Sequence, residues 1–242
     1  MTPSTEMVAQ IASLPFDIVA QLGVACGYER SFKMRRNSLL ANRYMLGVDT
    51  EGLTPEQLLN VCQRMDMPKA YLDSFAENAS EANLVFLGFE HDDNCCHYKI
   101  YLEFWEKIKQ GIRDKTDRQE PVLLHLGYKW DTNDNRHRAI ARYTCHPQLT
   151  VQGILSRISK IYDADHDETS HDETSLAIVA DIIKLAASTK QNISPIYLEA
   201  EEEGNPRVSF DVNIYSAALA AMCWSATARR RRSVTTRRTK RR

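Results

Sequence analysis

Cations, phenols and carboxylates alternate with apolar residues along several segments of this 242-residue chain. Between Tyr98 and Phe104, the residues Lys99, Tyr101 and Glu103 occupy every second position. Because successive side chains of a β-strand point to opposite faces, these three share one face and the apolar residues share the other. A lysine beside a phenol can hold an anion next to an aromatic or cationic group, and a carboxylate can accept a proton.

The same alternation recurs downstream. The polar faces there carry His125, Gly127, Lys129 and Asp131 in one segment, and Ser209, Asp211, Asn213 and Tyr215 in another. Such a face looks either into bulk water, as in an open two-layer sheet, or into a barrel lumen. The phenols Tyr101, Tyr197 and Tyr215, together with His125, favour a lumen, since these rings suit a sheltered surface.

Helical segments are expected between pairs of strands. Four hairpins are predicted, at 29–36 with 42–49, 83–90 with 97–104, 122–131 with 138–145, and 196–203 with 207–215. Helices are predicted at 4–22 with a break at Pro15, after Thr54, from Pro68, after Thr150 and at 175–187. The predicted fold class is therefore α+β, with repeated strand-strand-helix units that form an antiparallel sheet or barrel wrapped by helices.

A short echo supports an internal repeat. Leu87-Gly88-Phe89 is echoed by Leu126-Gly127-Tyr128 downstream and by Leu46-Gly47-Val48 upstream, each within a predicted strand. These echoes indicate that one supersecondary unit is used several times.

Charge divides the chain into an acidic body and a basic end. Residues 229–242 hold nine basic residues and no acid, which leaves 22 basic against 32 acidic residues in the remainder. We predict a single α+β domain over 1–222 and a basic low-complexity tail over 223–242, either disordered or the product of a shifted reading frame. An authentic tail would attract nucleic acid. No run of eighteen apolar residues and no CxxC pair occurs, so a cytoplasmic protein without membrane contact is expected.

Metal ligands are not evident in the sequence. The tandem His166-Asp-Glu-Thr-Ser170 and His171-Asp-Glu-Thr-Ser175 indicates a tolerant acidic loop, and Asp92-Asp93 indicates a solvated turn. No metal-binding residue is predicted, and a requirement for magnesium stays open because no DDxxD pair falls on the strands.

Lys99-Ile100-Tyr101 and, more loosely, Arg138-Ala-Ile-Ala-Arg142-Tyr143 resemble strand motifs of the ABBA-fold aromatic prenyltransferases. The resemblance covers the architecture from about Gly27 to Tyr215 and rests on short motifs. That family builds a barrel from repeated helix and strand-pair units with the helices outside. Four hairpins are fewer than the five repeats usual in the family.

The resemblance implies transfer of an allylic group from a diphosphate to a small aromatic acceptor. In that reading Arg35, Lys99, Lys129 and Arg142 would bind the diphosphate, and Tyr101, Tyr197 and Tyr215 would shield the allylic cation. Glu103 or Asp211 would orient the acceptor or take its proton. The alternatives are a non-catalytic binding or assembly protein that uses an open sheet face, and nucleic-acid binding through the basic tail.

Overall fold

The computed structural model describes residues 3–35, 38–92, 95–113, 120–134, 136–164, 173–188 and 195–214. Its strands are β1 (Cys26–Arg35), β2 (Ser38–Asp49), β3 (Leu84–Asp92), β4 (Cys95–Glu103), β5 (Val122–Asp131), β6 (Arg138–Cys145), β7 (Ile196–Glu202) and β8 (Asn205–Asn213). Its helices are α1 (Thr5–Leu22), α2 (Pro55–Arg64), α3 (Lys69–Ala79), α4 (Trp105–Arg113), α5 (Val151–Ala164) and α6 (Glu173–Ala187). The predicted tail over 223–242, Asp93 and both histidines of the acidic tandem lie outside the described residues.

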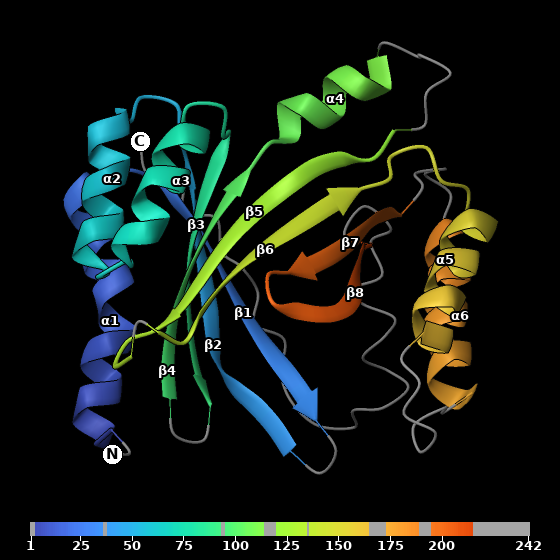
Figure 1. Ribbon diagram of the computed structural model, residues 1–242, viewed down its shortest axis with the longest axis horizontal. Coiled ribbons are helices and arrows are strands. Elements are labelled where there is room, and N and C mark those ends of the chain that lie inside the picture. The colour runs from blue at the N-terminus through green and yellow to red at the C-terminus, as the bar shows by residue number, and fades with distance from the viewer. Residues whose placement is uncertain are drawn as a thin grey trace, which may run out of the picture.

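The eight strands form one antiparallel sheet in sequence order, from β1 to β8. This sheet curls into a half-barrel, and its two edges are β1 and β8 (Figure 1). The prediction of an α+β fold built on an antiparallel sheet is confirmed. Strands β2 to β5 continue the alternation of the sequence, so this part of the sheet has one apolar and one polar face.

The apolar face carries most of the helices. Leu46, Leu87 and Ile100 lie in register on β2, β3 and β4, and all three are buried in the core beneath α1, α2 and α3. Farther along the same face, Phe210 and Val212 of β8 pack with α5 and α6 (Figure 1). These five helices therefore lie outside the curl, and the polar face lines its inside.

Helix α1 is continuous, so the predicted break at Pro15 is wrong. A proline has no N–H and leaves the carbonyl four residues earlier, that of Ile11, without its helical donor. The Tyr98 hydroxyl of β4 donates to this carbonyl oxygen at 2.8 Å. The Tyr44 hydroxyl of β2 donates to the next carbonyl, that of Ala12, at 2.6 Å. The sheet thus satisfies the backbone that the proline leaves open.

Helix α4 is absent from the sequence-based predictions, because its capping residue is remote in sequence. The Asn83 side chain, which precedes β3, accepts the Glu106 backbone N–H at 2.8 Å. On α4 the buried residue Ile108 packs with Leu124 and Cys145, and this helix closes the upper end of the sheet (Figure 1).

The predicted capping box of α2 is confirmed. The Thr54 hydroxyl accepts the Gln57 backbone N–H at 3.3 Å, and the Gln57 side-chain oxygen accepts the Thr54 backbone N–H at 2.8 Å. These two bonds satisfy backbone donors that the first turn of the helix leaves open.

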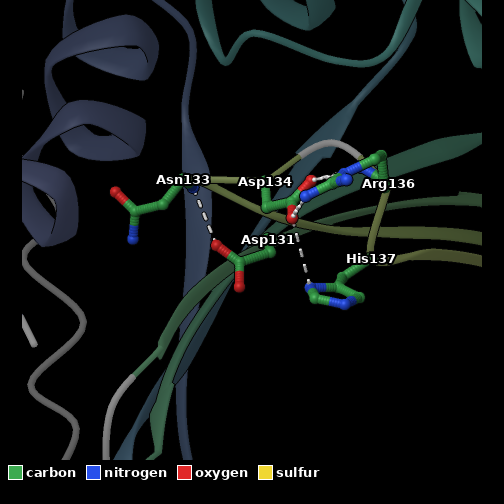
Figure 2. Close-up of polar contacts among 5 residues, drawn as sticks. All are labelled: Asp131, Asn133, Asp134, Arg136 and His137. Carbon is green, nitrogen blue, oxygen red and sulfur yellow. Dashed lines mark hydrogen bonds and ion pairs between the residues drawn. The ribbon is translucent and has the colours of Figure 1, made fainter. Parts of the chain in front are cut away.

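The turn between β5 and β6 is held by two aspartates (Figure 2). The Asp131 carboxylate accepts a hydrogen bond from the Asn133 backbone N–H at 2.7 Å. The Asp134 carboxylate accepts two hydrogen bonds from the Arg136 guanidinium, at 2.9 and 2.7 Å. These bonds to Arg136 lower the pKa of Asp134 well below its usual range. The contacts account for the polar turn predicted here, apart from Asn135, which lies outside the described residues.

A charged hollow on the inner face of the sheet

The inside of the curl encloses a hollow of about 640 Å³. Its wall runs from one sheet edge to the other and includes Lys33, Arg43, Glu90, Lys99, Tyr101, Lys129, Tyr143, Glu202, Ser209 and Asp211. Strand register arranges these side chains in parallel rows that cross the strands. Each row has its own chemistry.

One row is charged and buried. Arg43 pairs with Glu90, Glu90 with His97, and His97 with Asp131 across β2 to β5. The Glu90 side chain is only 2% exposed. Burial acts to raise the pKa of Glu90, but the attraction of Lys99, Lys129 and Arg43 outweighs it and lowers this pKa to about 2. Glu90 is therefore a carboxylate throughout the physiological range.

The next row supplies two ammonium groups. Lys99 and Lys129 are register partners on β4 and β5. The Lys99 ammonium bonds the Glu90 carboxylate, while Lys129 Nζ and the Arg43 guanidinium lie 3.9 and 3.5 Å from it. Arg43, Lys99 and Lys129 form what we call the cation cluster. With Glu90 included, the four groups carry two net positive charges, which is an environment for an anion.

The third and fourth rows are aromatic. The Tyr101 and Tyr143 rings lie 5.9 Å apart, Tyr143 and His125 5.8 Å apart, and His125 and Phe86 6.2 Å apart, all edge to face. We call these four residues the aromatic cluster. Burial is the main cause that raises the pKa of both Tyr101 and Tyr143, and the neighbouring Tyr143 phenol raises that of Tyr101 further. Both phenols are therefore neutral donors near pH 7.

The repeated Leu-Gly pairs of the sequence leave room for aromatic rings on the inner face of the sheet. In each pair the leucine faces the helices and the glycine lies on the inner face of the sheet, opposite a larger side chain of a neighbouring strand. Gly47 is the register partner of Phe86, and Gly127 that of Tyr101. A Cβ on Gly127 would lie 2.6 Å from the Tyr101 ring, and one on Gly47 2.9 Å from Phe86. The aromatic rings can lie flat on the sheet because these positions have no side chain.

The carboxylate Glu103 and the imidazole of His125 lie at the α4 end of the same face. Glu103 Oε2 is 3.6 Å from His125 Nδ1. Burial raises the pKa of Glu103 and lowers that of His125 to about 4. At neutral pH His125 is an uncharged base in contact with Tyr143.

Four residues predicted for the site line the hollow: Lys99, Tyr101, Lys129 and Asp211. Glu103 lies on the same face but belongs to a neighbouring cavity of about 420 Å³ beside α4. Asp211 lines the hollow from the edge strand β8, where its side chain is exposed but its carboxylate is partly desolvated, and this desolvation raises its pKa. The structure thus brings together the lysine and tyrosine of β4 with the lysine of β5.

The predicted placement of Arg142 and Tyr197 is wrong. Arg142 is the register partner of Leu126 and lies on the helix-bearing face, away from Lys99 and Lys129. Tyr197 is fully buried on that face, among the core residues of α5 and α6. Arg35 ends β1, with its side chain outside the described part, and Tyr215 lies beyond the described residues.

The residues of the hollow that are missing from the predicted site include Arg43, Glu90 and Tyr143, on which its charged and aromatic chemistry depends. Arg43 and Glu90 follow the period-two alternation of β2 and β3, so an extension of that pattern to both strands would have found them. Tyr143 follows alanines and arginines on β6, where neither face is clearly apolar. Its orientation therefore has no signal in the sequence.

A further cavity, also of about 420 Å³, lies on the outer side between α5 and the β7–β8 hairpin. Its central carboxylate, Glu199, accepts hydrogen bonds from Arg157 Nε at 2.6 Å, from Arg157 Nη2 at 2.8 Å and from the Tyr197 hydroxyl at 2.9 Å. His146 Nε2 is 3.3 Å away. These partners saturate Glu199, whereas Glu90 Oε1 and Arg43 Nε in the hollow have no hydrogen-bond partner among the described residues. The hollow is therefore the better candidate for a ligand site.

Within the described ranges, no three His, Cys, Asp or Glu side chains converge as a metal site. No helix in these ranges is long and apolar enough to cross a membrane. Comparisons with protein families, curated proteins and solved structures found no match to this chain. The candidate site therefore depends on the geometry of the hollow.

Proposed function

We propose that the hollow binds an allylic diphosphate and transfers its allylic group to a small aromatic acceptor, as the Lys-x-Tyr resemblance to the ABBA-fold prenyltransferases implies. The observation that carries this proposal is the adjacency of the cation cluster and the aromatic cluster. The guanidinium of Arg43 and the ammonium groups of Lys99 and Lys129 supply charge for the phosphates. The rings of Tyr101 and Tyr143 lie in the next rows and suit an allylic chain or an aromatic ring.

The reaction would be an electrophilic aromatic substitution. The C–O bond of the diphosphate ester breaks, and its electron pair leaves with the diphosphate oxygen. Negative charge on this leaving group grows toward the transition state, so Lys99 and Lys129 stabilise the transition state more than the ground state. The faces of Tyr101 and Tyr143 stabilise the allylic cation. A carbon of the acceptor ring then forms the new C–C bond.

The ring carbon that has formed this bond must lose its proton. Asp211 lines the hollow and has a raised pKa, so it is the proposed proton acceptor. Glu103 contacts His125, which in turn contacts Tyr143. We assign Glu103 a positioning role for these two rings instead of direct contact with the substrate.

The proposal also holds that the chain is built from four repeated hairpin-and-helix units within one domain. The recurrence of a Leu-Gly pair at Gly47, Gly88 and Gly127, each with its glycine on the inner face of the sheet, supports it. The half-barrel would then be an incomplete form of the closed barrel of that family. The role of residues 223–242 in nucleic-acid binding stays a separate prediction.

Calorimetric titration tests the anion site. The full chain is titrated with dimethylallyl, geranyl and inorganic diphosphate, each with and without magnesium. Lys99→Ala should weaken binding by about 1.5–3 kcal/mol, because it removes a charge-assisted contact. Lys107→Ala is the matched control, since Lys107 lies on the outer surface and pairs with Glu81. The Lys107→Ala protein should bind the diphosphates as tightly as the unmodified protein does.

Turnover separates catalysis from binding. Incubation of geranyl diphosphate with a panel of small phenols and indoles, followed by mass spectrometry, should give a prenylated product that Asp211→Asn diminishes. Binding without any product would favour the non-catalytic reading, in which the hollow of an open sheet holds an anionic ligand. No binding of any of the three diphosphates would contradict the proposed site.

A further inference from the structure

Glu90 is an unexpected residue for an anion site. Its carboxylate is buried on the floor of the hollow, where it faces all three groups of the cation cluster. A site built only to attract an anion would omit this negative charge, since it cancels one of three positive charges. The carboxylate therefore needs another explanation.

The explanation lies in the crowding of cations around Lys99. Burial is the main cause that lowers the pKa of Lys99 to about 8, and the nearby charges of Lys129 and Arg43 lower it further, while Glu90 acts in the opposite direction. The other polar groups of these rows are His97 and Tyr101 on β4 and Asp131 on β5. Burial lowers the pKa of His97 and raises that of Tyr101, so both are neutral near pH 7.

Glu90 is also the group that fixes the position of the ammonium. Lys99 bonds Glu90 Oε2, while the buried Glu90 Oε1 accepts no hydrogen bond from any described residue. Arg43 Nε likewise has no hydrogen-bond partner in the described part of the chain. One buried acceptor and one buried donor thus belong to the same cluster of charges as the Lys99 ammonium.

We propose that Glu90 is a positioning residue of the anion site, which holds the Lys99 ammonium charged and directed into the hollow between Arg43 and Lys129. This inference rests on the proposed function, because it assumes that the hollow takes an anion. It assigns Glu90 no contact with the substrate. Without Glu90, Lys99 would release its proton at a lower pH, and the site would lose a charge where it is needed.

The first test needs no ligand. Lysines are reductively methylated with ¹³C-formaldehyde, which preserves their charge, and the Lys99 signal is identified by its loss in Lys99→Arg. The NMR titration midpoint of Lys99 should fall by at least about one pH unit in Glu90→Gln, since an opposite charge within hydrogen-bond distance has been removed. Glu90→Asp should restore part of the shift. Glu202→Gln, which removes another carboxylate of the hollow, should leave the midpoint unchanged.

The second test uses sulfate, a dianion whose own charge is constant over the working range. Calorimetry from pH 6 to pH 9 should show sulfate affinity falling as Lys99 deprotonates, and Glu90→Gln should move this fall to lower pH by the same amount as the NMR midpoint. At pH 6, where Lys99 is protonated in both proteins, Glu90→Gln should bind sulfate at least as tightly as the unmodified chain.

The outcomes separate the two proposals. If diphosphates bind and the Lys99 midpoint does not fall in Glu90→Gln, the role of Glu90 is wrong and the proposed function stands. If the midpoint falls but neither sulfate nor geranyl diphosphate binds, the anion site is wrong, although the effect of Glu90 on Lys99 stands. Should Glu90→Gln fail to fold, the midpoint and sulfate profile of Glu90→Asp decide the matter, and no change in either overturns the inference.

Discussion

Replacement of Tyr98 by phenylalanine should destabilise the protein, and the cost should depend on Pro15. In the native chain the Tyr98 hydroxyl donates to the Ile11 carbonyl at 2.8 Å. Pro15 cannot donate to that carbonyl, so Tyr98→Phe leaves a helix carbonyl with no donor. A buried polar group without a partner costs about 1–3 kcal/mol. In the Pro15→Ala background, the alanine N–H can supply the missing helical bond.

A double-mutant cycle isolates this dependence. In the Pro15→Ala background, Tyr98→Phe should cost only the net value of one hydrogen bond, about 0.5–1.5 kcal/mol. The coupling energy between the two positions should therefore be on the order of 1 kcal/mol. For a chain of this size, each kcal/mol corresponds to roughly 2–4 °C in Tm.

Tyr44 provides the matched control. Its hydroxyl donates to the Ala12 carbonyl at 2.6 Å. This carbonyl can also accept a helical hydrogen bond from the backbone N–H four residues later. Tyr44→Phe should thus show coupling to Pro15 below about 0.5 kcal/mol. Urea unfolding of the four proteins in each cycle gives both coupling energies. An equal cost of Tyr98→Phe in the native and the Pro15→Ala backgrounds would refute the explanation of the continuous helix.

Three further expectations concern the hollow, the core and the pH dependence. Gly127→Ala should cost about 1–3 kcal/mol in urea unfolding, because the added Cβ would lie 2.6 Å from the Tyr101 ring; Gly27→Ala, whose Cβ has no atom closer than 3.9 Å, should have little effect. Phe210→Ala should cost less than about 3 kcal/mol, the lower bound for a fully buried ring, since Phe210 is only half-buried; a larger loss of unfolding free energy would contradict this packing. Glu90 has a folded pKa of about 2 against 4.5 for the free group, so its contribution to stability is complete above pH 4.5 and lost as the pH falls toward 2. Glu90→Gln should lack this acid dependence. If the unfolding free energies of the two proteins ran parallel between pH 6 and pH 3, this contribution of Glu90 would be excluded.

Most of the sheet was predictable because its strands alternate between apolar and polar residues. The alternation from Tyr98 to Phe104 placed Lys99 and Tyr101 on the inner face directly. The β7 strand lacks this contrast, since Tyr197 packs beneath α5 and α6 while Leu198 packs beneath α4. A strand buried on both faces has no periodicity that reveals its orientation. The misplacement of Tyr197 follows from that.

Long-range contacts account for the remaining differences. The cap of α4 comes from Asn83, which lies 23 residues before the N–H that it accepts. The donor that completes α1 comes from Tyr98, 87 residues after Ile11. Local sequence signals for helix capping and helix breaking do not indicate hydrogen-bond partners this far away in the sequence. The opposition of Glu90 to the cation cluster likewise depends on register across four strands, which sequence patterns leave undetermined.

The two edge strands have a consequence for behaviour at high concentration. Each of β1 and β8 has a single neighbour in the described sheet, so one row of backbone N–H and C=O groups on each strand is available to another molecule. On β1 the charged side chains of Glu29, Arg30 and Lys33 are exposed and oppose such stacking. Salt screens this repulsion within about 10 Å at 0.1 M. We therefore expect light scattering from concentrated protein to increase with sodium chloride, the reverse of ordinary salting-in, and an unchanged signal up to molar salt would show that the edges do not self-associate.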